Sequence, residues 1–297
     1  MGLVAVVGTG AMGSRMAVRL QNAGHELVVY DVEPKRTDPL AERGVRVARS
    51  AAEAGTGADI AFTSVPDASA LKEACLGPAG LLTAEPPPRI VADVSTVAPA
   101  QSAVVAEAAE RLGVGFLRCP VSGTTVHVES GTLTVIASGP REVFGAAAPY
   151  LAVLGQACFY LGPGEAARYV KLAVNLMVAS EAQALAEAYC LIEKSSIDPV
   201  KAAEVFIGCV ATSPIIKLKT AAMLARDFSP AATTRTLLKD LDLALATAEE
   251  LGVELPASKV VRDFVSSVAQ DGMGDLDFSS ILLRLEKLAG LQKAEDV

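Results

Sequence analysis

The stretch LVAVVGTGAMGSRMAVRLQNAGHELVVYD (residues 3–31) decides the fold of the first half of the chain. An apolar run, LVAVVG, leads into the pattern G-x-G-x-x-G, formed by Gly8, Gly10 and Gly13, and a helix-forming segment follows. A second strand-like run, ELVVYD, ends at Asp31. This order of strand, glycine turn, helix, strand and terminal acid is typical of a dinucleotide-binding βαβ unit.

Each glycine has a separate physical task in such a unit. The first makes the tight turn, the second lets backbone N–H groups approach a pyrophosphate, and the third allows close packing of helix on strand. The helix N-terminus adds a favourable field for the anion. The sequence therefore predicts cofactor binding by Gly8, Thr9, Gly10, Ala11, Met12 and Gly13.

Asp31 bears on the choice of cofactor. It lies 18 residues after Gly13, where an acid hydrogen-bonds the hydroxyls of the adenine ribose. A carboxylate repels a 2′-phosphate, so NAD is favoured over NADP. Arg36 is close enough in the chain to offset this repulsion, and NADP stays open as the less favoured cofactor.

Further strand-like runs alternate with helical patterns up to residue 162. Alternation of this kind predicts a doubly wound, mainly parallel sheet, in which ligands bind outside the carboxyl ends of the strands. The expected strands are 59–65, 89–95, 115–121, 132–139 and 157–162, and the expected helices lie around 68–75, 98–112 and 140–153.

Three of these strand ends carry candidate binding residues: Val65-Pro66, Ser95-Thr96 and Ser122-Gly123-Thr124. Each also has a plain structural interpretation, because Pro ends a ladder, Ser or Thr caps a helix, and Ser-Gly-Thr makes an ordinary turn. Their common position at the ligand-binding edge favours function. Backbone N–H groups in the Ser-Gly-Thr turn are suited to form a nest for a small carboxylate.

The character of the chain changes at Gly162-Pro163-Gly164. Beyond this break the sequence predicts helices only, at 165–194, 199–207, 214–225, 230–251, 256–270 and 278–290. We therefore expect an α/β Rossmann-like N-terminal domain (1–162) and an all-α C-terminal domain (163–297), joined by the long helix 165–194.

The long helix carries the candidate acid–base group. Its first half is apolar almost all round, which predicts burial. Arg168, Lys171 and Asn175 form one polar stripe on it. Burial of a lysine lowers its pKa toward the working pH, as a general base requires. The plain alternatives are a lysine whose head reaches solvent and a structural ion pair for Arg168.

Composition argues against several classes of function. A net charge of −8 and a pI near 5.0 argue against nucleic acid as a partner. The sequence has no apolar run long enough for a bilayer and no signal-peptide pattern at its start. Five scattered cysteines without a CxxC pair predict no metal centre and indicate a reduced, cytoplasmic protein.

Taken together, the motifs resemble the β-hydroxyacid dehydrogenase family, which includes 3-hydroxyisobutyrate dehydrogenases and tartronate semialdehyde reductases. The resemblance covers nearly the whole chain and implies hydride transfer between NAD(P) and a small 3-hydroxy acid or semialdehyde. It also implies a C-terminal domain like that of 6-phosphogluconate dehydrogenase. The motifs are GTGAMGSRMA (8–17), DVSTVAP (93–99), PVSGTTVHVESGTLT (120–134), KLAVN (171–175) and LLKDLDLA (237–244).

The resemblance assigns roles to individual residues. Lys171 falls on the catalytic general acid–base and Asn175 on its helper amide, while Ser122 and Gly123 fall on the turn that holds the substrate carboxylate. Lys239 falls on the lysine that closes over substrate and cofactor; the plain alternative is an exposed ion pair. The positions that line the nicotinamide and its ribose fall on Val65, Pro66 and Thr96.

The chain departs from the family beside the substrate site. Arg118-Cys119 replaces Asp-Ala, Thr124 replaces a second glycine, and Val174 replaces the first of two asparagines. Arg118 either adds an anion contact or lies in solvent. These changes leave the substrate open among hydroxyisobutyrate, tartronate semialdehyde, succinic semialdehyde and related small carboxylates.

Two other functions stay open. Imine reductases resemble this family in architecture but commonly carry Asp or Tyr in place of the lysine, so Lys171 argues against that activity. A non-catalytic NAD-binding module would not need Lys171 or the Ser122-Gly123 turn. The apolar helical domain suggests a homodimer or homotetramer.

Overall fold

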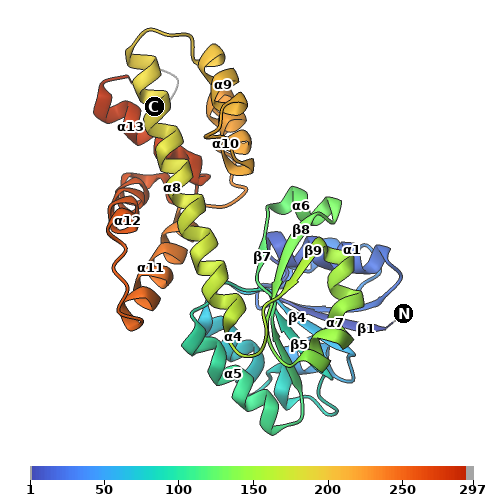
Figure 1. Cartoon of the computed structure of the whole chain (residues 1–297). Helices are drawn as coiled ribbons and strands as arrows, with labels where there is room; N and C mark the ends of the chain where they lie inside the picture. Colours follow the sequence, from blue (N-terminus) through green and yellow to red (C-terminus); the bar gives the residue numbers. More distant parts are fainter. Residues whose placement is uncertain (1, 292–297) are drawn as a thin grey trace. The chain divides into compact units, whose positions relative to one another are not determined.

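The computed structural model describes residues 2–291, which divide into two compact units between Lys171 and Leu172 (Figure 1). This division lies inside helix α8 (Ala166–Lys194), which the sequence places at the start of its second domain. The predicted domain boundary at 162/163 stays a prediction. No helix among the described residues has both the length and the hydropathy needed to cross a membrane.

The first unit is built on a six-stranded sheet in the order β3-β2-β1-β4-β5-β6, and every neighbouring pair is parallel. The central strands are continuous apolar runs because both faces of a parallel sheet are covered by helices. This confirms the Rossmann-like architecture. The strands are β1 (Leu3–Val7), β2 (Glu26–Tyr30), β3 (Arg46–Val47), β4 (Ile60–Thr63), β5 (Ile90–Asp93) and β6 (Gly115–Arg118).

Helices cover the two faces of this sheet (Figure 1). Met16 and Leu20 of one helix share a core with Leu151, whereas Leu71 and Val105 belong to the core on the opposite face. The first group is α1 (Ala11–Asn22) and α7 (Arg141–Leu154); the second is α3 (Ala51–Gly55), α4 (Ala68–Leu76) and α5 (Pro99–Arg111). Short α2 (Asp38–Ala41) connects β2 to β3.

A separate three-stranded sheet differs from the expectation. The predicted strands 132–139 and 157–162 become β8 (Leu133–Ala137) and β9 (Gly155–Tyr160), which pair with each other in parallel. The predicted strand 115–121 is divided between β6 and a short strand β7 (Val121–Ser122), and β7 pairs antiparallel with β8. Pro120 lacks the N–H that a central strand needs, and the chain turns there into this second sheet. Short α6 (Thr125–Ser130) joins β7 to β8.

The second unit is helical throughout its described residues, apart from one isolated β-bridge, which confirms the all-α prediction. Tyr189, Leu241, Val265 and Ile281 belong to its core. Besides α8, its helices are α9 (Pro199–Gly208), α10 (Pro214–Ala225), α11 (Thr234–Glu250), α12 (Pro256–Val268) and α13 (Ile281–Ala289).

The first half of α8 is not buried all round. Tyr169 is 42% exposed and Met177 is 62% exposed, although Ala167 and Leu172 are buried. The expectation of burial on every side was wrong, because only one side of the helix packs into a core. Part of the apolar surface of α8 is therefore not covered by other side chains of this chain.

Hydrogen bonds hold the start of α8 to the first unit. The Ser138 hydroxyl donates to the Gly164 carbonyl (2.7 Å) and accepts from the Ala167 N–H (3.0 Å). Ser138 is fully buried at the end of β8. One hydroxyl therefore binds two backbone groups that flank the first turn of the helix, where N–H groups have no partner within the helix itself.

Replacing Ser138 by Ala is expected to lower the free energy of unfolding by about 1–3 kcal/mol, because the buried Ala167 N–H and the partly buried Gly164 carbonyl lose their partner. Chemical unfolding followed by circular dichroism measures the loss. Ser130→Ala removes a hydroxyl from an exposed position and serves as the control. Equal effects of the two substitutions would contradict the anchoring role.

Candidate active site

The carboxyl ends of β1, β4 and β5 meet at one edge of the large sheet. Val7 is in register with Thr63, and Thr63 with Asp93. The ladder continues past the strands, since the Ser64 N–H donates to the Val7 carbonyl (2.9 Å) and the Val94 N–H to the Thr63 carbonyl (3.0 Å). The structure therefore brings the glycine loop and the segments that carry Val65-Pro66 and Ser95-Thr96 to a common edge.

Two glycines of the loop are required by packing. Gly8 has φ +90°, and a Cβ there would lie 2.3 Å from the Ser64 carbonyl oxygen. A Cβ at Gly13 would lie 1.9 Å from the Gly8 carbonyl oxygen. Real Cβ atoms do not approach backbone this closely, so these glycines fix the turn and the contact between helix and strand.

Gly10 differs from the other two. It is the N-cap of α1, and a Cβ built on it would meet no atom within 4 Å. No side chain caps this helix end, although the first N–H groups of a helix lack partners within it. Open space beside uncapped N–H groups is what a bound pyrophosphate requires, so the loop fits the dinucleotide.

Asp31 lies just after β2 and is tied to the same loop. Its buried carboxylate accepts hydrogen bonds from the backbone N–H of Thr9 (2.7 Å) and of Glu33 (2.9 Å). The Arg36 guanidinium lies 3.5 Å away, and its side chain is 56% exposed. The acid therefore has a structural task in the loop in addition to the predicted contact with ribose.

A hydrogen-bonded network lies behind the strand ends. Asp93 Oδ1 accepts from the Thr63 hydroxyl (2.7 Å) and from the Ser95 N–H (3.2 Å). The Ser95 hydroxyl in turn accepts from the Val65 N–H (3.0 Å). This network links the loops after β4 and β5.

Ser95 and Thr96 do not cap the following helix. The N-cap of α5 is Ala98, whose N–H donates to the side-chain oxygen of Gln101 (3.2 Å). Pro99 opens the helix at its first position, where a missing N–H costs nothing. The plain interpretation of Ser95-Thr96 as a cap was therefore wrong.

Arg168 connects α8 to this network. It is 1% exposed and forms an ion pair with Asp93, which is fully buried. Its other nitrogens donate to the Ser95 carbonyl (2.6 Å) and to the Ser102 hydroxyl (3.2 Å). Lys171 is half-buried and lies one helical turn further along α8.

The Ser122-Gly123-Thr124 turn, predicted to hold a carboxylate, requires a glycine and contains a hydrogen bond to His127. Gly123 has φ +137°, and a Cβ there would lie 3.0 Å from the Cβ of His127. The Thr124 N–H donates to His127 Nδ1 (3.1 Å). This N–H therefore already has a partner within the turn.

The departures before this turn are structural. Arg118 is buried and forms an ion pair with Glu165, so the interpretation that it lies in solvent was wrong. Cys119 is fully buried, and burial raises the pKa of its thiol far above the usual value. A thiol that stays protonated is a poor nucleophile, so Cys119 contributes packing to the core.

In the helical unit, Asn175 and Lys239 share one partner. The Asn175 amide donates to Asp240 Oδ2 (2.7 Å), and Lys239 Nζ lies 2.8 Å from Asp240 Oδ1. Asp240 is buried, so it holds both groups in a partly desolvated setting. The plain interpretation of Lys239 as an exposed surface pair does not describe this arrangement.

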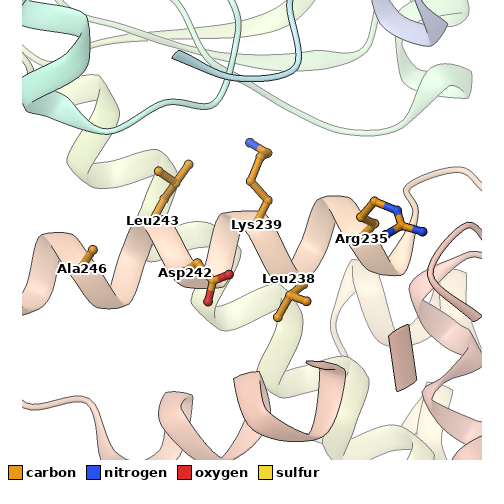
Figure 2. A pocket seen from close by; sticks show the side chains of 6 residues that line it. All are labelled: Arg235, Leu238, Lys239, Asp242, Leu243 and Ala246. Atoms are coloured by element: carbon orange, nitrogen blue, oxygen red, sulfur yellow. The ribbon is translucent and has the colours of Figure 1, made fainter. Parts of the chain in front are cut away.

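A hollow of about 490 Å³ follows one side of α11 and is lined by that helix alone. Lys239 and Leu243 extend from the same side of the ribbon (Figure 2), as their four-residue spacing requires. The Asp242 and Arg235 side chains are bound to Arg262 and Asp275 respectively.

The sequence did not predict the roles of the buried acids Asp93 and Asp240 or the bond between Thr124 and His127. Asp93 lies within the quoted DVSTVAP motif, but nothing in the sequence shows that its partner is Arg168. Thr124 and His127 have the spacing of a capping box, with His in place of the usual Glu or Gln. The described part of the chain contains no group of His, Cys, Asp or Glu suited to hold a metal ion.

Two family models match the chain. Residues 3–162 match the NAD binding domain of 6-phosphogluconate dehydrogenase. Residues 165–285 match the model described as NAD-binding of NADP-dependent 3-hydroxyisobutyrate dehydrogenase. Together the two matches cover both the sheet domain and the helices.

Curated relatives cover almost the full chain. The 3-hydroxyisobutyrate dehydrogenase of Pseudomonas aeruginosa is 33% identical over 287 residues, which are 94% of this chain and 96% of the relative. The 2-hydroxy-3-oxopropionate reductase of Escherichia coli is 30% identical over 283 residues, 95% and 97% of the two chains.

Solved structures agree with this assignment. A 3-hydroxyisobutyrate dehydrogenase of Mycobacterium tuberculosis with L-serine superposes with a TM-score of 0.86 at 28% identity, over 96% of this chain and 99% of the other. An imine reductase from Pseudomonas superposes with a TM-score of 0.61 at 20% identity and shares the fold. The chain therefore belongs to the β-hydroxyacid dehydrogenase family of NAD(P)-dependent oxidoreductases.

Proposed function

We propose that this chain interconverts a small 3-hydroxy acid and the matching semialdehyde, with NAD as the preferred cofactor and Lys171 as general acid–base. The observation that carries the proposal is the Arg168 network, which ties the start of α8 to the strand ends that carry Val65, Ser95 and Thr96. Lys171 follows one turn later on the same helix.

The bound nicotinamide supplies the hydride acceptor or donor. In the oxidative direction the Lys171 amine would take the proton of the substrate hydroxyl as the carbonyl forms. In reduction the Lys171 ammonium returns that proton to the oxygen. No metal ion is required in this scheme.

Other residues are assigned to orientation of the substrate. Ser122, Gly123 and Thr124 are proposed to bind the carboxylate, and Lys239 to add a positive charge to it. Asn175 donates its Nδ2 group to Asp240, so its carbonyl oxygen is left to accept a hydrogen bond from an ammonium or hydroxyl group.

The substrate is a short carboxylate of the kind named by the relatives: 3-hydroxyisobutyrate or 2-hydroxy-3-oxopropionate (tartronate semialdehyde). A panel identifies it: 3-hydroxyisobutyrate is assayed with NAD and with NADP, and tartronate semialdehyde and succinic semialdehyde are assayed with NADH and with NADPH. The absorbance of the reduced cofactor follows each reaction. A cyclic imine in the same panel tests the alternative activity. Turnover of the imine alone would replace the proposed function.

We also propose a homodimer or homotetramer and a cytoplasmic location. Exposed apolar side chains on α9, such as Val200 and Val205, support assembly. The net charge of −8 supports the absence of a nucleic-acid partner. Light scattering coupled to gel filtration measures the assembly.

Lys171→Ala is expected to lower kcat by about 10²–10⁴-fold, because the proton of the hydroxyl loses its acceptor. Binding of NADH, measured by fluorescence titration, is expected to stay unchanged. Lys72→Ala on the exposed side of α4 is the control. Full turnover of the Lys171 variant with normal cofactor binding would refute the assignment.

Gly10→Ala is expected to fold normally and to lose NADH binding by at least about tenfold, because its methyl group occupies space needed by the pyrophosphate. Thermal unfolding and NADH titration separate the two effects. Gly145→Ala, at an equally open position in α7, is the control and should bind NADH as the wild type does. A Gly10 variant with normal affinity would show that the pyrophosphate lies elsewhere.

Asp31→Ser is expected to shift the ratio of kcat/KM values toward NADP by about tenfold or more, since it removes a charge that repels the 2′-phosphate. It also releases Arg36 from its acidic neighbour. Adding Arg36→Gln to Asp31→Ser should cancel part of the gain. An unchanged preference for NAD would sink the role given to Asp31.

A further inference from the structure

We propose that Arg168 is a positioning residue for hydride transfer, which sets the first turn of α8, and with it Lys171, relative to the loops after β4 and β5. The inference rests on the proposed role of Lys171. The family motifs quoted above assign Arg168 no role, and the sequence pattern predicts for it only a structural ion pair, which the contact with Asp93 confirms.

The contacts of Arg168 are unusually complete. Three guanidinium nitrogens have separate partners: Asp93 for one, the Ser95 carbonyl for the second and the Ser102 hydroxyl for the third. A buried cation requires such partners, because an unpaired charge inside a protein is very costly. The fork of guanidinium donors makes three bonds in fixed directions, which a lysine ammonium cannot reproduce.

These partners belong to segments predicted to bind the cofactor. Ser95 receives the Arg168 bond on its carbonyl, while its hydroxyl accepts from the Val65 N–H. The Asp93 carboxylate forms an ion pair with Arg168 and accepts a hydrogen bond from the Thr63 hydroxyl. One side chain of α8 is therefore linked, through direct bonds and one intermediate residue, to the two loops proposed to line the nicotinamide.

Arg168 and Lys171 are three residues apart on a continuous helix, so they share a face. A displacement of the Arg168 end of the helix changes the position of the lysine amine. A mutation far from the chemistry that misplaces a reacting group by about 1 Å can cost on the order of 10²-fold in rate. The network therefore acts on the geometry of proton and hydride transfer, although Arg168 itself touches no substrate.

The chain supplies a matched control at the same helix start. Arg118 is also buried and also forms an ion pair, with Glu165. Its contacts differ, because Arg118 Nε has no hydrogen-bond partner and the pair does not include Ser95, Val65 or Asp93. A lysine can replace a single ion-pair contact of this kind far better than it replaces three directed bonds.

The experiment compares Arg168→Lys with Arg118→Lys in the full-length protein. Arg168→Lys is expected to lower kcat by about 10–100-fold, while its dissociation constant for NADH, measured by fluorescence, stays within about fivefold because the glycine loop is untouched. Arg118→Lys should keep kcat within about threefold of the wild type. Equal kcat values for the two variants would overturn the proposal.

Hydrogen exchange in the cofactor-free protein gives a readout independent of activity. Arg168→Lys is expected to raise exchange in residues 93–98 and 166–171 together, whereas Arg118→Lys leaves 93–98 unchanged. Where Arg168→Lys fails to fold, Ser102→Ala removes one of the three bonds and keeps the ion pair. Unchanged kcat and unchanged exchange in Ser102→Ala would then reject the positioning role.

Lys171→Ala in the same series separates the two hypotheses. If that variant keeps full turnover, the proposed function fails whatever Arg168 does. If it is inactive while Arg168→Lys and Arg118→Lys behave alike, only the positioning role fails.

Discussion

A buried guanidinium and a buried carboxylate meet at the point where the sheet edge joins the long helix. Neither Arg168 nor Asp93 is stable alone in its surroundings, since a buried charge needs a partner and hydrogen bonds. Together they require that the end of β5 and the first turn of α8 keep one arrangement. The pair therefore selects one local conformation, and this effect is larger than its net contribution to the free energy of unfolding.

The glycines at the same edge of the sheet have different structural roles. Gly8 and Gly13 are needed by the packing of the protein on itself, whereas Gly10 leaves open space beside uncapped N–H groups. Asp240 has a comparable task in the helical unit, where it holds the groups of Asn175 and Lys239. Buried acids thus hold candidate residues in place within each unit, without being the predicted reactive groups.

Much of the fold could be predicted because its signals are local. Apolar runs that end in Gly8 and Asp31 define the first βαβ unit, and the change at Gly162-Pro163-Gly164 marks the start of the helices. Long-range pairing could not be predicted in the same way. The turn of the chain into a second sheet after Pro120 and the bond from Thr124 to His127 depend on tertiary packing. Burial of α8 was overestimated, because hydrophobicity alone does not say which side has a neighbour.

The carboxylate of Asp31 couples two properties that are usually treated separately. It accepts the Thr9 N–H of the glycine loop, and it also lies where the adenine ribose is expected. Discrimination between the two cofactors and the rigidity of the pyrophosphate loop are therefore thermodynamically linked through one side chain. An evolutionary or engineered change of cofactor preference at this position carries a general loss of dinucleotide affinity, unless the new residue also provides an acceptor for that N–H.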